Sequence, residues 1–462
     1  MASRCALDPG SWTRPTICIL AVLLTGQPPL RGLGQTPPDT APHLPIATLN
    51  GWADEVWLAL TDRDGSYLGR LAEQGTFQRF NPLMDPEYEL DVRTSLFTPS
   101  EDARWASVGE GFRAAGASIN HPFILNLVDW REEIPVSGSV NLRARYHRHR
   151  SLTAQRDYTR LGLLWRGVFG SGWNLETGLG VHFFKPSADV DLILGRTWAN
   201  PGGRRWDLRL RVAALDAFNN MIFNGLGVGE DEVEAHLDYL RSPVAGRLAL
   251  QSDSDFGRVE IHGGITNRSE VRVTFPGSGA VSYTLKECVG FGGILAEVTP
   301  APSLALAAFA AWARAETDRR HDLPGEGDFT LKEETLTVGF RQRVRTGQRV
   351  SLEVDVAAIW RPEDRSGIDG PLVRHRDREI FGMLALASVP APGFAWRFVL
   401  AGLDRDAGEL TPDLTAGNLR NVLEWGYRFA SGFHVMAGLR WDLDRFSRYP
   451  FDGGHLRISS SW

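Results

Sequence analysis

Basic side chains recur at alternate positions in three segments of the chain, and these are the residues best placed to act on a solute. The three rows are Arg143, Arg145 and His147; Arg205, Arg209 and Arg211; and Arg341 and Arg343. Side chains two residues apart on an extended strand point to the same side. Such rows predict a pore lining whose fixed positive charge favours anionic solutes. Acidic residues such as Glu353 and Asp355 lie in a neighbouring segment, so structural ion pairing stays open as the alternative.

The other polar residues do not form a catalytic or metal-binding pattern. His147 and His149 have the spacing of a His-x-His pair, but arginines surround them and no third ligand is evident. No nucleophile-elbow sequence marks a Ser-His-acid site, and no glycine-rich loop for phosphates is present. We therefore expect no catalytic residue, no metal and no cofactor, and a hydrolase stays the least favoured function class.

Many segments, including those with the basic rows, alternate apolar and polar side chains, and the last part of the chain does so most clearly. Between Leu419 and Phe429 the odd positions are apolar except for Asn421, and charged side chains occur only at even positions. The alternation continues from Phe433 to Leu443. A period of two predicts strands with one apolar and one polar face. Strands of roughly ten residues with aromatic side chains beside tight turns are typical of antiparallel barrels that span a bilayer.

The spacing of turn residues predicts an all-β fold, a transmembrane antiparallel up-and-down β-barrel of roughly 16 to 20 strands. Short turns rich in Gly, Pro and Ser are expected at 135–138, 200–203, 300–303, 345–348, 390–393 and 430–432. Longer polar loops are expected at 217–232, 317–330, 361–378 and 404–417. Tight periplasmic turns and long extracellular loops are the usual asymmetry of such barrels. Two packed soluble sheets are disfavoured, because their outer faces should be polar.

The beginning of the chain is expected to direct export. Arg4 and Arg14 precede an apolar run at 17–24, which predicts a signal peptide over residues 1–34. Residues 35–85 then form a periplasmic lead, and apolar side chains at helical spacing within 46–61 predict a short helix that could plug the barrel. The barrel follows at 86–462. Removal of the signal would leave Cys288 as the only cysteine, which excludes an intrachain disulfide.

The last residues carry a family resemblance. Leu456 and Ile458 alternate with polar residues, and the chain ends on Trp462. This ending resembles that of the porin-like outer-membrane β-barrels of Gram-negative bacteria, in architecture only and without a motif that identifies a subfamily. The resemblance implies location in the bacterial outer membrane, contact with its lipid, and recognition of Leu456, Ile458 and Trp462 by the barrel-assembly machinery. It also allows a homo-oligomer.

These observations together predict a porin-like channel for passive diffusion of small hydrophilic solutes, with a preference for anionic ones if the basic rows are unpaired. A structural or secretion-assisting outer-membrane barrel with a plugged lumen is the alternative. The formal net charge of −6 argues against a nucleic-acid partner, because nucleic-acid binding normally needs a basic surface.

Overall fold

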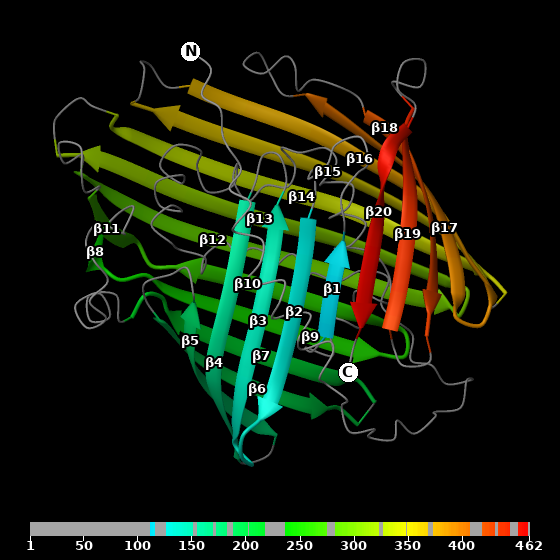
Figure 1. The fold of residues 1–462 in the computed structure, drawn as a ribbon, viewed down its shortest axis with the longest axis horizontal. Coiled ribbons are helices and arrows are strands. Elements are labelled where there is room, and N and C mark those ends of the chain that lie inside the picture. The colour runs from blue at the N-terminus through cyan, green and yellow to red at the C-terminus, as the bar shows by residue number, and fades with distance from the viewer. Residues whose placement is uncertain are drawn as a thin grey trace, which may run out of the picture. The chain divides into compact units, whose positions relative to one another are not determined.

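The computed structural model consists of one antiparallel sheet (Figure 1). It describes residues 111–460 apart from 116–125, 151–154, 170–171, 183–187, 202, 218–235, 275–281, 323–326, 348, 368–372, 407–417, 430–432 and 444–450. The chain divides into units 1–43 and 44–462, and every described strand belongs to the second. The expected signal peptide, the periplasmic lead with its helix at 46–61, and Trp462 lie outside the described residues.

The described strands in the first half of the sheet are mostly 10 to 15 residues long. They are β1 (Gly111–Ala115), β2 (Asn126–Pro135), β3 (Val140–Arg150), β4 (Gln155–Phe169), β5 (Trp173–His182), β6 (Ala188–Ala199), β7 (Arg205–Ala214), β8 (His236–Arg241), β9 (Val244–Ser254), β10 (Gly257–Thr266) and β11 (Ser269–Thr274).

The next six strands are longer, at 13 to 20 residues, and the last three return to about the earlier length. They are β12 (Ser282–Ala301), β13 (Leu304–His321), β14 (Phe329–Thr346), β15 (Val350–Ser366), β16 (Val373–Ala391), β17 (Phe394–Asp406), β18 (Asn418–Arg428), β19 (Phe433–Asp442) and β20 (Phe451–Ser460).

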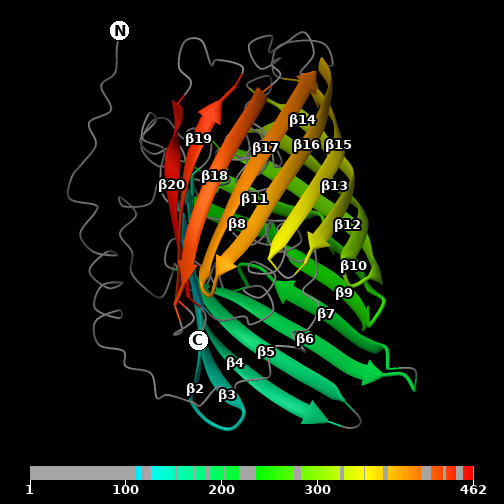
Figure 2. The ribbon, with the colours of Figure 1, turned by 90° about the vertical axis from the view of Figure 1, so that its right-hand side faces the viewer.

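Successive strands pair with one another around the sheet (Figure 2). β1 pairs with β2 on one side and with β20 on the other, so the pairing returns to its first strand. β8 and β9 together occupy one strand position with an interruption between them, and β10 and β11 occupy the next. These two interrupted strands lie side by side, since β9 pairs with β10 and β8 pairs with β11. The twenty strands therefore occupy 18 positions. The predicted all-β antiparallel up-and-down architecture and the predicted range of strand number are confirmed.

The interruption between β8 and β9 has a local cause. Pro243 lies there, and proline has no N–H to donate to a sheet. Asn267, at the matching break between β10 and β11, bridges the gap with its side chain. Its Nδ2 donates to the carbonyl oxygen of Ser242 at 3.0 Å, and its Oδ1 accepts from the N–H of Val244 at 2.7 Å. One amide side chain thus replaces ladder hydrogen bonds that the proline and the break remove.

The described tight turns lie where the sequence predicts them, but the strands run further than expected at the other rim. The expected turn at 430–432 and nearly all of the expected loop at 217–232 lie outside the described residues. Only two residues separate β12 from β13, and two separate β16 from β17. Gly347 and Gly393 adopt positive φ angles of 69° and 77° at two such turns, which glycine does without strain. The boundaries predicted for the loops at 317–330, 361–378 and 404–417 are wrong, because β13 to β17 extend into these ranges. The outward side chains of the β13 and β14 extensions are mostly charged and pair across the strands, as Glu316 does with Lys332.

The outward face of the sheet carries an exposed apolar belt. On β15, Val350, Leu352, Val356 and Trp360 are exposed, and residues of the opposite parity are buried. From Val350 to Trp360 the chain rises about 33 Å at about 3.3 Å per residue, and a tilt of about 40° reduces this to about 25 Å of height. That height is the hydrocarbon thickness which an outer-membrane barrel covers. The belt therefore fixes the part of each strand that lies in the bilayer.

Candidate functional site

The basic rows Arg205 to Arg211 and Arg341 to Arg343 lie on the face opposite the belt. On β14 the outward side chains Leu336, Val338 and Phe340 are exposed, whereas Arg341 and Arg343 are buried. On β7 the outward residues Leu210 and Val212 are exposed, and the basic residues have the other parity. The inner wall of the barrel is therefore the candidate functional site.

Both arginines of the third row form ion pairs across two neighbouring strands. Arg341 lies directly opposite Asp355 in the pairing of β14 with β15, and Arg343 lies opposite Glu353. The Arg341 guanidinium contacts the Asp355 carboxylate, and the Arg343 Nε donates to Glu353 Oε1 at 2.6 Å. The Arg341 side chain is 0% exposed. For this row the structure favours structural pairing over a free positive field.

The same arrangement recurs further around the wall, between β17 and β18. Arg397 lies opposite Glu424 in register. Its Nε and terminal nitrogen approach Glu424 Oε2 at 2.7 and 2.6 Å. Because cross-strand neighbours of opposite charge stabilise a sheet, the inward parity here is a ladder of paired charges rather than a row of one sign.

The second basic row is more accessible. Arg211 binds Asp191 of β6 with two hydrogen bonds, of 3.0 and 2.8 Å. Arg209 donates to Asp207 on its own strand at 2.9 Å, but its side chain is 68% exposed. Arg205 is exposed as well. On the next strands along the wall, Arg166 of β4 pairs with Glu176 of β5 at 2.9 Å and is half-exposed. The wall from β4 to β7 thus presents partly solvated charges.

The first basic row is placed only through its backbone. Arg143, Arg145 and His147 lie on β3, where the register sets Arg143 opposite Glu133 and His147 opposite Asp129. Their side chains lie outside what the structure describes. The register brings each of these two basic residues beside an acidic residue of β2.

A further polar cluster on β10 is absent from the sequence-based expectations. Arg258 contacts the buried Glu260, and His262 Nε2 lies 3.4 Å from Glu260 Oε2. Arg258 Nε also lies 3.6 Å from Asp253 of β9. The signal was present as Arg-x-Glu-x-His at alternate positions. It was missed because Pro243 and the break at Asn267 obscure the strand pattern of the segment.

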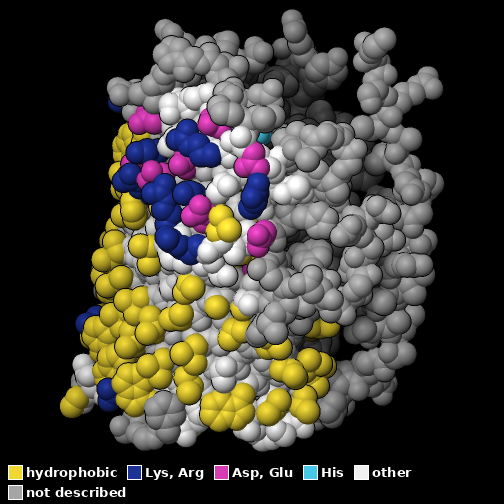
Figure 3. Space-filling view, turned by 90° about the vertical axis from the view of Figure 1, so that its left-hand side faces the viewer, with side chains coloured by type: hydrophobic (Ala, Val, Ile, Leu, Met, Phe, Trp, Pro, Cys, Tyr) yellow, Lys and Arg dark blue, Asp and Glu magenta, His cyan; other side chains and the backbone are white. Residues whose placement is uncertain are grey.

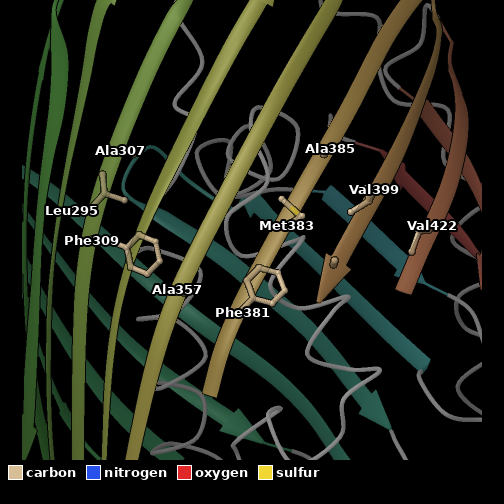
Figure 4. Close-up of a cluster of buried hydrophobic side chains, with 10 residues drawn as sticks. Leu295, Ala307, Phe309, Ala357, Phe381, Met383, Ala385, Val399 and Val422 are labelled. Carbon is tan, nitrogen blue, oxygen red and sulfur yellow. The ribbon is translucent and has the colours of Figure 1, made fainter. Parts of the chain in front are cut away.

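An apolar band on the inner wall was not expected either (Figure 4). Ten buried residues of β12 to β18 form one cluster: Leu295, Ala307, Phe309, Ala357, Phe381, Met383, Ala385, Val399, Ala401 and Val422. Phe309 lies over its cross-strand neighbour Gly339, where an added Cβ would come within 2.1 Å of the ring. The inner wall is therefore shielded and largely apolar at β12 to β18. At β4 to β7 exposed arginines such as Arg209 alternate with buried residues such as Leu164 and Ala213.

The C-terminal residues are placed in part. Leu456 and Ile458 lie on β20, where Leu456 pairs with Ala437 and Ile458 with Val435 of β19. Ile458 also pairs with Ala114 of β1, so this residue sits where the last strand meets the first. Among the described residues, no group of three His, Cys, Asp or Glu side chains could hold a metal ion, and no helix is long and apolar enough to cross a membrane.

No protein-family model matches the chain, and no curated protein matches it. Among solved structures it is similar to OmpT of Vibrio cholerae with loop L8 deleted, an outer membrane protein, at 8% identity over 76% of this chain and 97% of that chain (TM-score 0.36). It is also similar to the siderophore receptor PirA from Pseudomonas aeruginosa, at 9% identity over 76% of this chain and 79% of that chain (TM-score 0.31).

A third similar structure is the toluene transporter TodX of P. putida, at 8% identity over 77% of this chain and 90% of that chain (TM-score 0.28). All three likenesses are at 9% identity or less and have TM-scores below 0.5. They do not identify a subfamily.

Proposed function

We propose that the protein is a porin-like outer-membrane channel through which small hydrophilic solutes diffuse along the inner wall of β4 to β7. The observation that carries the proposal is the exposure of individual arginines on that wall. Arg209 is 68% exposed, whereas Arg341 is 0% exposed. Charged side chains that keep their hydration mark the surface along which water and polar solutes can pass.

The pairing of the arginines argues for weak charge selectivity. A ring of like charges attracts counter-ions into a pore, but Arg166, Arg209 and Arg211 each contact a carboxylate within 3.0 Å. The field of such a pair falls off more steeply with distance than that of a single charge. We therefore propose a pore that accepts small polar solutes of either sign, with anion preference confined to the less screened Arg205 and Arg209.

Conductance of residues 35–462, refolded and inserted in a planar bilayer under a salt gradient, tests this proposal. We expect discrete steps, and we expect Arg205→Gln with Arg209→Gln to move the reversal potential toward cation preference. Arg349→Gln, an exposed arginine at a tight turn, is the matched control and should leave the potential unchanged. A folded barrel that shows no steps, or a double variant with the wild-type potential, would contradict the proposal.

A barrel with a plugged lumen is the second candidate, in a structural or secretion-assisting role. The specific observation in its favour is the burial of the inner wall at β12 to β18, where side chains as small as Ala307 and Ala385 are almost fully shielded. Deletion of 46–61 should raise the conductance severalfold if that segment obstructs the lumen. An unchanged conductance after the deletion would remove this segment as the plug.

The proposal assigns no catalytic role to the chain and no cofactor. Its partners are the outer-membrane lipid, the barrel-assembly machinery and the permeating solutes, with a homo-oligomer as the assembly to test by crosslinking in the membrane. Hydrolysis of generic ester or peptide substrates by the refolded protein, abolished by substitution of a single inner-wall residue such as His262, would replace the channel with an enzyme.

A further inference from the structure

The outward side chains of β11 to β14 change from apolar to charged above the apolar belt. Trp312 of β13 is the last apolar side chain of its parity, and its Nε1 donates to Glu334 Oε1 of β14 at 2.6 Å. Beyond it the outward side chains are charged, and Figure 3 shows charges of both signs above the apolar surface. We call this surface the collar, and its residues are Arg268, Glu270, Arg272, Lys286, Glu316, Asp318, Arg320, Asp322, Asp328 and Lys332.

The collar is a two-dimensional set of ion pairs that joins four strands. Lys286 lies directly opposite both Glu270 and Asp318, and Glu316 lies opposite Lys332. Lys286 Nζ is 3.1 Å from Glu270, and Lys332 Nζ is 3.8 Å from Glu316. The register itself therefore places opposite charges beside each other on this face.

Further pairs connect the ends of the same strands. Arg320 lies 3.0 Å from Asp318 and 3.7 Å from Asp328. Arg272 lies 2.5 Å from Asp322. Arg268 approaches Asp318 more loosely, at 3.9 Å.

In each of these pairs the basic side chain is the more exposed partner. Arg320 is 55% exposed and Asp318 only 17%. Lys332 is 48% exposed and Glu316 only 28%. The basic groups are therefore the more accessible charges of the collar, by a wide margin at Arg320 and by a small one at Arg272, which is 50% exposed against 45% for Asp322. An anion that approaches from outside thus meets the guanidinium and ammonium groups more readily than the carboxylates.

The position of the collar limits what can lie against it. From Trp312 to Glu316 and on to Arg320 the chain rises about 13 and 26 Å at about 3.3 Å per residue, or about 10 and 20 Å of height at a tilt of about 40°. The belt below faces hydrocarbon, and the tight turns lie at the opposite rim. The collar is therefore at the level where the headgroups of the outer leaflet begin and the sugars above them continue.

We propose that the collar docks the phosphate-bearing glycolipid of the outer leaflet, with Arg268, Arg320 and Lys332 as the groups that bind its phosphates. The proposal rests on the outer-membrane location, and not on conduction of solutes. Arginine suits this task because its guanidinium can bind two phosphate oxygens at once. The apolar belt directly beneath would contact the acyl chains of the same lipid molecule.

Native mass spectrometry of the folded barrel in a neutral detergent, titrated with diphosphoryl lipid A, tests the proposal. The double variant Arg320→Gln and Lys332→Gln should bind the lipid about 25-fold more weakly, since each cation near an anionic lipid surface contributes about fivefold. Asp318→Asn should bind it more tightly, because it removes the carboxylate that faces Arg320 and Arg268. Arg349→Gln, at the opposite rim, is the control and should bind like the wild type.

Several results would overturn the proposal. Equal affinity of the double variant and the wild type would show that the collar does not hold the lipid. Equal affinity for lipid A without its phosphates would assign binding to the acyl chains alone, and competition by millimolar inorganic phosphate would indicate a site for free phosphate. Planar-bilayer conductance of the same variants distinguishes failure of the lipid-docking proposal from failure of the channel proposal. A variant that conducts normally is folded and inserted, so its lipid affinity then reports on the collar alone.

Discussion

The buried pair Arg341 and Asp355 makes the sharpest prediction about stability. Both side chains are almost fully buried and lie opposite each other in register. Removal of one partner of a buried ion pair costs about 3–5 kcal/mol, because the other charge is left without compensation. Asp355→Leu and Arg341→Met should each destabilise the barrel by about that amount.

The double variant should behave differently. Ala307 lies opposite Arg341 on one side, and Met383 lies opposite Asp355 on the other, so two apolar replacements would extend the apolar band of the inner wall. Asp355 Oδ1 is buried and has no hydrogen-bond partner among the described residues, which weakens the case for the native pair. We expect the double variant to lie within about 1 kcal/mol of the wild type, or above it.

Urea unfolding of the barrel in lipid vesicles, followed by tryptophan fluorescence and by the mobility of the folded form on gels, measures these free energies. Lys332→Gln in the collar is the matched control for an exposed ion pair and should cost at most about 1 kcal/mol. The reasoning would be refuted if Asp355→Leu were as mild as Lys332→Gln, or if the two inner-wall substitutions added to each other instead of compensating.

Three further predictions concern the wall, the membrane boundary and the rim. Gly339→Ala should cost about 1–3 kcal/mol, because the new methyl group displaces the Phe309 ring; Gly382→Ala, with nothing within 4 Å of its Cβ, should cost far less in the same urea assay. Cys288 lies on β12, four residues from Gly292, which pairs with Trp312 at the upper edge of the belt. It should therefore react with a water-soluble maleimide in vesicles. Ala308→Cys in a Cys288→Ser background lies in the belt and should stay unmodified; equal labelling of both would place the boundary wrongly. Hydrogen bonds from Ser282 and Arg272 lower the pKa of Asp322, so its contribution to stability is present above the usual carboxyl pKa and is lost as the pH falls through the lowered value. Asp322→Asn should therefore be less stable than the wild type at neutral pH and should lose this difference in acid, and an acid titration of unfolding midpoints measures it.

The sequence predicts the architecture well because a barrel repeats one simple rule. Alternation between Leu419 and Phe429 determines which residues face outward, and tight turns such as Pro390–Gly393 set the order of the strands. It predicts strand ends poorly at the long-loop rim, because Ala315 is the only apolar residue between Arg314 and Arg320 and the segment shows no apolar alternation of its own. Their regularity lies in cross-strand pairing with Lys286 and Lys332, which depends on register and is not visible in one segment alone.

The inner wall shows the same limit. Arg341 and Arg343 are two residues apart, and from their own segment they form a positive row. Only the register with β15 shows that Asp355 and Glu353 oppose them. The sequence also did not reveal the shielded apolar band. Alanines such as Ala307, Ala357 and Ala385 are only weakly hydrophobic, and they form an apolar surface only because six strands bring the residues of the band together.

The two faces of β13 connect the proposed functions. Its outward parity passes from the apolar belt to the collar at Trp312, so one strand carries the residues for the hydrocarbon and for the headgroups. Its inward parity carries Ala307 and Phe309 of the shielded band at the level of the belt. The proposed lipid site and the shielded band thus share β12 and β13, whereas the proposed solute path follows β4 to β7. Substitutions in the collar should therefore change lipid affinity and leave the conductance unchanged.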